Sequence, residues 1–145
     1  MFIGDLTDRG PDSPAVVELV SSLVSRQLAQ CVLGNHELNL LREARKEGNG
    51  WCFDDNQDHR KNKFLESRAL KAENRPAIHA FLGNLPIALE RSDLRLVHAA
   101  WHPASIEGIR ASPFSALELY SLRHDRAIQL GMDTGLADRA NLEAP

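Results

Sequence analysis

The feature of this sequence that most constrains its fold is a pattern of strand, glycine turn and helix that occurs twice. The apolar residues 2–3 run into a polar turn at residues 4–10, and helical spacing of apolar residues follows. The apolar run at residues 30–33 likewise leads into the turn 34–37 and a second helical segment. An order of strand, helix, strand, helix predicts an α/β fold with parallel strands and crossover helices. In such folds the reactive groups collect on loops at the carboxyl ends of the strands, where both turns lie.

Spacing and capping residues predict the elements around these turns. Ser13 can cap the first helix with Pro14 in its first position, and apolar spacing carries that helix to about Ala29. The polar, irregular residues 48–63 predict a long loop over the site, and residues 99–112 predict a second loop that contains proline. Further helices are predicted at 37–46, 64–72, 76–82 and 113–130, and a β-hairpin is predicted from the apolar runs 87–90 and 94–97.

Composition places the chain among ordinary globular proteins. Its 145 residues are enough for one domain, and 43% hydrophobic residues beside 26% charged residues allow a sizeable core. The net charge of -3 gives no global attraction to nucleic acid or to an anionic membrane, so neither is expected as a partner. No apolar stretch approaches the roughly 18 residues of a membrane helix. Cys31 and Cys52 form no CxxC pair, which favours free thiols in a reducing compartment. We therefore expect a single cytoplasmic domain over residues 1–145.

The two turns carry residue types that suit phosphate chemistry. The first turn has the sequence GDLTDRG, in which Asp5, Asp8 and Arg9 lie between glycines that allow the backbone to turn tightly. A carboxylate can bind a hard or borderline metal ion, and a guanidinium fork can bind phosphoryl oxygens. The second turn has the sequence GNHE, and His98 follows the apolar residues 94–97. Because parallel strands end at the same edge of a sheet, we expect the two turns to lie side by side.

GDLTDRG followed by GNHE resembles the calcineurin-like metallophosphoesterase superfamily, in particular its phosphoprotein phosphatase branch, to which bacterial diadenosine tetraphosphate hydrolases are also similar. The resemblance covers about residues 1–102. It implies a metallophosphoesterase-type α/β/β/α sandwich with mixed sheets and two divalent metal ions, which could be manganese, iron or zinc. Of the family's five motifs the chain shows the second, the third and, at His98, the fourth. The GDxHG and late Gly-His motifs are not in this sequence, so we expect an incomplete domain of a longer enzyme, poorly active as it stands.

The resemblance also implies metal ligands. Asp5 would bridge the two metal ions, and Asn35 would bind the second metal through its amide oxygen. His98 would be a further ligand to that metal, with His102 as the competing candidate. With these ligands the second metal keeps three and the first keeps little beyond Asp5, so weak metal binding is expected.

The same resemblance implies the catalytic roles. Arg9 would bind the non-bridging phosphoryl oxygens, and Asn35 would also contact the substrate. His36 would donate a proton to the leaving oxygen while Asp8 orients its ring. The aromatic residues Trp51, Phe53 and Trp101 are interpreted as local packing, with stacking on a nucleobase as the alternative.

Three functions follow from these residues. The first is hydrolysis of a phosphate ester on a phosphorylated serine or threonine of a protein, by a bacterial-type phosphatase. The second is cleavage of a small phosphorylated substrate, a dinucleoside polyphosphate such as diadenosine tetraphosphate. The third is a module that binds phosphate without catalysis, which the intact Asp8, Arg9 and His36 disfavour. The oligomeric state is not readable from the sequence.

Overall fold

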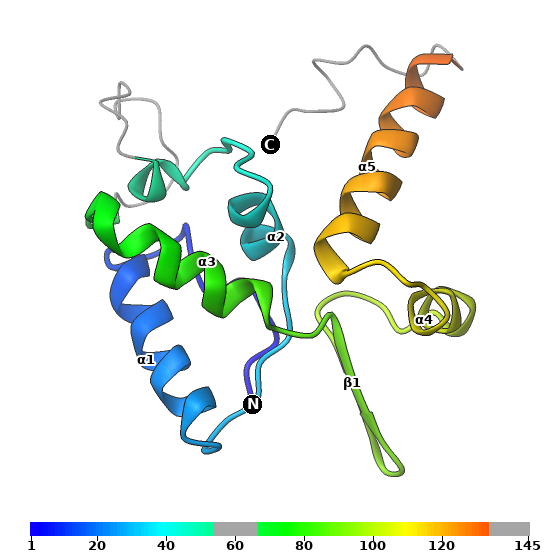
Figure 1. Cartoon of the computed structure of the whole chain (residues 1–145), viewed down its shortest axis with the longest axis horizontal. Helices are drawn as coiled ribbons and strands as arrows, with labels where there is room; N and C mark the ends of the chain where they lie inside the picture. The colour runs from blue at the N-terminus through cyan, green and yellow to red at the C-terminus, as the bar shows by residue number, and fades with distance from the viewer. Residues whose placement is uncertain (54–66, 134–145) are drawn as a thin grey trace. The chain divides into compact units, whose positions relative to one another are not determined.

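The computed structural model describes residues 1–53 and 67–133, which are coloured in Figure 1. The chain divides into two compact units, Met1–His102 and Pro103–Pro145. All of the predicted site residues lie in the first unit, which is therefore described in more detail. The single domain over residues 1–145 stays a prediction.

The first helix, α1, covers Ser13–Ser25. Asp12, not Ser13 as predicted, is its N-cap, because the Asp12 carboxylate accepts a hydrogen bond from the Ala15 backbone N–H at 3.0 Å. The predicted end near Ala29 is also wrong. Gln27 has a φ of 59°, a left-handed conformation that cannot continue a helix. Val17 and Val20, on one face of α1, are buried.

Two segments that are far apart in the sequence run in parallel beneath the turns. The Phe2 N–H donates to the carbonyl of Gln30 at 2.9 Å, and the Val32 N–H donates to the carbonyl of Phe2 at 3.2 Å. This pairing is a parallel bridge between Phe2 and Cys31, as the sequence order predicts. Leu33 in turn donates to the carbonyl of Pro86 at 2.9 Å. The two glycine turns therefore leave the same edge of this small parallel contact.

The second helix, α2, covers Asn35–Leu41 and thus begins and ends before the predicted 37–46. It starts directly after the extended residue Gly34. It cannot run to residue 46, because Glu43 has a φ of 55°. Leu38 and Leu40 are buried. The GNHE turn is consequently the first turn of this helix, and its side chains are fixed by helical geometry.

The remaining elements of the first unit complete its core. Residues 50–52 form the short 3₁₀ helix η1 (Gly50–Cys52), and η3 covers Ala72–Asn74. The helix α3 covers Arg75–Gly83, as predicted, and lies against α1 and α2 (Figure 1). The strands β1 (Ala88–Arg91) and β2 (Leu94–Val97) form the predicted antiparallel hairpin, with Ala88 opposite Val97. The core of this unit contains Val17, Val20, Val32, Leu33, Leu38, Leu40, Ile78, Leu82 and Leu85.

Two loop and helix predictions need correction or fall outside the described residues. Residues 67–71 are not helical, so the prediction of a helix at 64–72 is wrong for that part, and residues 64–66 lie outside the described residues. The predicted loop 48–63 contains η1, and its residues 54–63 also lie outside the described residues.

The described part of the second unit, residues 103–133, contains two helices. One of them, α4 (Pro103–Arg110), lies where a loop was predicted. Pro103 at its first position is a common helix start that could have signalled it. The other, α5 (Ala116–Asp133), agrees with the predicted helix at 113–130. Within residues 1–53 and 67–133, no helix combines the length and the apolar character that a membrane span requires.

Candidate functional site

The two glycine turns lie backbone against backbone. Gly4 has a φ of 82°, and a Cβ atom added there would lie 2.5 Å from the Gly34 backbone nitrogen. A Cβ added at Gly34 would lie 2.5 Å from Asp5 Oδ1. Only glycine allows the turns to approach this closely. Asp5 and Asp8 also have positive φ angles, 52° and 78°, a conformation that aspartate tolerates better than most residues. The expectation that the turns lie side by side is confirmed.

Glu37 joins the two turns and was not predicted as a site residue. Its side chain is fully buried, with 0% of its surface exposed. Oε2 accepts hydrogen bonds from the backbone N–H groups of Asp5 and Gly34, both at 2.9 Å. Oε1 accepts one from the N–H of Leu6 at 2.8 Å. The bond to Gly34 is half of a capping box, in which a glutamate at the third helical position reaches back to the N-cap. That motif was visible in the sequence, but the two bonds to the first turn were not.

His36 and Asp8 form the predicted pair. Nδ1 of His36 lies 2.7 Å from Asp8 Oδ2. The pKa of His36 is raised above its ordinary value, mainly by this hydrogen bond and further by the negative charges of Asp8 and Asp5. Burial of the ring and the positive charge of Arg9 oppose the increase. The ring is therefore poised to carry the proton that a general acid donates, and its Nε2 atom faces Asp5 Oδ2 at 3.8 Å.

Asp8 is buried and is held by hydrogen bonds of its backbone N–H and of both carboxylate oxygens. Its exposed fraction is 2%, its backbone N–H donates to Ser13 Oγ at 3.1 Å, and its Oδ1 accepts a hydrogen bond from the indole Nε1–H of Trp51 at 2.7 Å. Trp51 is itself buried, with 5% of its surface exposed. The contact between Trp51 and Asp8 was not predicted. A tryptophan far along the chain gives no sequence signal that it donates to a specific carboxylate.

The side chains of His98 and Asp5 lie next to each other. Nε2 of His98 lies 3.3 Å from Asp5 Oδ1, and Nδ1 lies 2.6 Å from the carbonyl oxygen of Ile3. A carbonyl can only accept, so Nδ1 carries a proton, and a neutral ring then offers a lone pair at Nε2. Asp5 Oδ1 is buried and has no hydrogen-bond partner among the described residues. Two lone-pair donors that face one another suit a cation between them, whereas a doubly protonated ring would form an ion pair with Asp5 instead.

The fit to two metal ions is incomplete. Across residues 1–53 and 67–133, no group of three or more His, Cys, Asp and Glu side chains is arranged to hold a metal ion. The predicted third ligand, Asn35, is an amide at the exposed first position of α2. Asp5 and His98 therefore form a pair of ligands for one cation, the role of Asn35 as a third ligand stays a prediction, and a second cation needs ligands beyond them. The contact with Asp5 is made by His98, which favours it over His102.

The remaining predictions for the site concern Arg9 and the aromatic side chains. The side chain of Arg9 is exposed, and its charge is near enough to lower the pKa of His36. The buried ring of Phe53 is covered by the guanidinium groups of Arg45 and Arg75, with centroid distances of 5.1 and 5.4 Å. That contact agrees with the interpretation of Phe53 as local packing.

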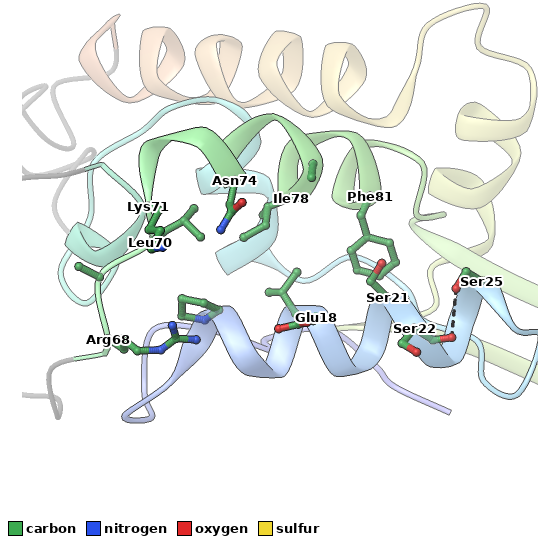
Figure 2. A pocket seen from close by; sticks show the side chains of 14 residues that line it. Glu18, Ser21, Ser22, Ser25, Arg68, Leu70, Lys71, Asn74, Ile78 and Phe81 are labelled. Atoms are coloured by element: carbon green, nitrogen blue, oxygen red, sulfur yellow. Dashed lines mark hydrogen bonds between the residues drawn. The ribbon is translucent and has the colours of Figure 1, made fainter.

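A groove with a volume of about 700 Å³ lies between α1 and α3, away from these residues (Figure 2). Glu18 and three serines of α1 face Asn74, Ile78 and Phe81 across it. None of the six predicted site residues lines the groove. The candidate site is therefore the pair of turns and not this groove.

The comparisons with known proteins agree on one family. A family model described as calcineurin-like phosphoesterase matches residues 1–128. The symmetrical bis(5'-nucleosyl)-tetraphosphatase of Janthinobacterium sp. (strain Marseille) is 35% identical over 106 residues, 71% of this chain and 33% of the relative. That of Aromatoleum aromaticum is 34% identical over 116 residues, 80% of this chain and 37% of the relative.

A relative of the asymmetrical type matches a shorter part. The bis(5'-nucleosyl)-tetraphosphatase PrpE of Geobacillus thermodenitrificans is 54% identical over 41 residues, 28% of this chain and 17% of the relative. The chain thus spans roughly a third or less of the length of these curated relatives. No solved structure matches the chain. The helices and the small sheet of the chain agree with the predicted α/β metallophosphoesterase class. Because the family model matches residues 1–128, the chain belongs to the calcineurin-like phosphoesterase family.

Proposed function

We propose that this protein hydrolyses phosphate anhydrides of dinucleoside tetraphosphates, with at least one divalent metal ion bound at the glycine turns. The observation that carries the proposal is the arrangement of an acid pair, His36 and Asp8, next to a cation-binding pair, Asp5 and His98. The relatives described above are named as tetraphosphatases, which favours this substrate over a phosphoprotein. The hypothesis of a phosphoprotein phosphatase, which the sequence motifs favoured, is therefore weaker than the hypothesis of a tetraphosphatase.

His36 acts as the general acid in this proposal. Asp8 accepts from Nδ1, so the proton available for catalysis is on Nε2, the atom that faces Asp5. When the bond between phosphorus and the leaving oxygen breaks, the electron pair stays on that oxygen, and His36 supplies its proton. Water provides the oxygen atom that is added to phosphorus.

Arg9 and the metal ligands stabilise the phosphoryl group. The exposed guanidinium of Arg9 binds non-bridging phosphoryl oxygens, where negative charge accumulates. Asp5, Asn35 and His98 would hold a divalent cation, which supplies Lewis-acid stabilisation of the same charge. Manganese, iron and zinc all accept carboxylate, amide and imidazole ligands. The metal identity, the two-ion site and the cytoplasmic location stay predictions.

A comparison of substrates tests the proposal. The full-length protein would be assayed with diadenosine tetraphosphate and with a phosphoserine peptide, each in the presence of manganese, iron or zinc. We expect a higher kcat/KM for the dinucleotide. Products of two ADP molecules would indicate symmetrical cleavage, and AMP with ATP would indicate asymmetrical cleavage. A higher kcat/KM for the peptide would contradict the proposal and favour a phosphoprotein phosphatase.

A matched pair of variants supplies the control. Asp5→Asn removes a charge from the site and should lower kcat/KM on the order of 100-fold or more, as losses of directly acting groups do. Asp93→Asn makes the same change in the exposed β1–β2 turn, where Asp93 pairs with Arg91, and should leave activity unchanged. Phosphate binding without any turnover by the wild-type protein would support the non-catalytic reading instead.

A further inference from the structure

We propose that Trp51 is a positioning residue for the acid His36, acting through Asp8 as the far end of a hydrogen-bonded series of three side chains. The proposal rests on the proposed function, because it assigns Trp51 a part in the proton donation described above. The two outer members lie on different segments, η1 and the start of α2, and the carboxylate of Asp8 lies between them.

The hydrogen bonds divide the Asp8 carboxylate between two donors. Oδ1 accepts from the Trp51 indole at 2.7 Å, and Oδ2 lies 2.7 Å from Nδ1 of His36. The torsion that turns an aspartate carboxylate about its own axis is broad, so one hydrogen bond alone fixes the plane of the group poorly. A second donor on the other oxygen fixes that plane. The imidazole that donates to Oδ2 is then also held in one orientation.

The segment that carries Trp51 is built against the first glycine turn. Gly48 has a φ of 92°, and a Cβ atom added there would lie 2.7 Å from the Asp8 carbonyl oxygen. The buried Asn49 closes the loop by accepting from the Lys46 N–H at 3.0 Å and donating to the Ala44 carbonyl at 2.9 Å. The carbonyl of Trp51 accepts from the N–H of Leu70 at 2.8 Å. The backbone on both sides of the indole is thus fixed.

Tryptophan suits this task chemically. An indole N–H is a donor that neither accepts a hydrogen bond nor titrates in water, so it can satisfy a buried carboxylate without taking or giving a proton. A buried carboxylate oxygen without a donor is unfavourable, and Asp8 is 2% exposed. Loss of the indole N–H would leave Asp8 free to turn toward another donor and away from His36.

The first test is spectroscopic and does not depend on turnover. The chain has two tryptophans, Trp51 and Trp101, so an amide correlation spectrum contains two indole cross-peaks, and Trp101→Phe assigns them. Trp51 should give the downfield, slowly exchanging peak, because its acceptor is a buried carboxylate. Asp8→Asn replaces that acceptor by a neutral amide and should move the Trp51 peak upfield. A Trp51 peak that Asp8→Asn leaves in place overturns the proposal.

The second test separates positioning from general stability. Trp51→Phe should lower kcat on the order of 10-fold and leave KM within about twofold, since general acid catalysis contributes roughly 10²–10⁴-fold and only its geometry is disturbed. Trp101→Phe is the matched control and should have no effect. In the Asp8→Asn background, Trp51→Phe should cause no further loss of kcat, because Trp51 acts only through Asp8.

The outcomes distinguish this proposal from the proposed function. A wild-type protein that turns over neither the dinucleotide nor a phosphate ester overturns the proposed function, and the position of the Trp51 cross-peak still decides whether the hydrogen bond exists. An active wild-type protein in which the losses from Asp8→Asn and Trp51→Phe multiply overturns the role of Trp51 alone.

Discussion

Glu37→Gln is the most informative single substitution for the architecture of the site. The glutamate and glutamine side chains have nearly the same shape, so the change affects charge and hydrogen bonding with little effect on packing. Glu37 is fully buried and accepts the N–H groups of Asp5, Leu6 and Gly34 at 2.8–2.9 Å. A glutamine oxygen placed at Oε2 retains two acceptor bonds, and its NH₂ group then faces the Leu6 N–H, where two donors oppose each other.

The expected loss of stability follows from these bonds. A hydrogen bond to a charged group contributes about 1.5–3 kcal/mol and a neutral one about 0.5–1.5 kcal/mol, so the two retained bonds each lose about 1 kcal/mol. The unsatisfied Leu6 N–H, which is partly buried, costs about 1–2 kcal/mol more. The free energy of unfolding should fall by about 3–4 kcal/mol, a large part of the 5–15 kcal/mol that is typical of a domain.

Urea unfolding followed by circular dichroism measures this loss. Glu73→Gln makes the same chemical change at an exposed position of η3 and should alter the free energy of unfolding by less than about 0.5 kcal/mol. The site should suffer as well, because Glu37 fixes the distance between the turns that carry Asp5 and His36. A loss below about 1 kcal/mol for Glu37→Gln would show that the carboxylate does not bind the turns as described.

Two further predictions concern the turns themselves. In the metal-free chain, an NMR titration should give His36 a pKa above its ordinary value, and Asp8→Asn should lower that pKa, since Asp8 is the main cause of the increase. Equal His36 pKa values in the wild type and in Asp8→Asn would contradict the role of Asp8. Because the pKa of His36 is higher in the folded state, its stabilisation of the fold is complete below the unfolded pKa, about 6.5, and is lost as pH rises through the folded pKa. Gly34→Ala should abolish activity and destabilise the fold, because its Cβ would lie 2.5 Å from Asp5 Oδ1, whereas Gly50→Ala has nothing within 4 Å and should be tolerated. Activity and unfolding assays on this pair check the prediction, and equal effects would refute it.

Several features of the fold follow from the sequence because their causes are local. The parallel order of the segments around Phe2 and Cys31 and the hairpin of β1 and β2 come from apolar spacing and turn residues. Helix ends were predicted less well. The helices α1 and α2 stop where Gln27 and Glu43 adopt positive φ angles, and nothing in those two residue types demands that conformation. Each end is closed by local backbone hydrogen bonds, from the Leu28 N–H to the Leu23 carbonyl and from the Ala44 N–H to the Asn39 carbonyl.

For the site, the sequence by itself determined the chemical groups at the strand ends: two carboxylates and an arginine between glycines, and a histidine that follows a glycine. Only the tertiary structure decided how they are held. Glu37 binds the backbone of a turn that lies far from it in the sequence, and Trp51 donates to Asp8 from η1. Hydrogen bonds between such distant residues depend on distance and direction in space, and sequence spacing carries information only about neighbours along one helix or strand.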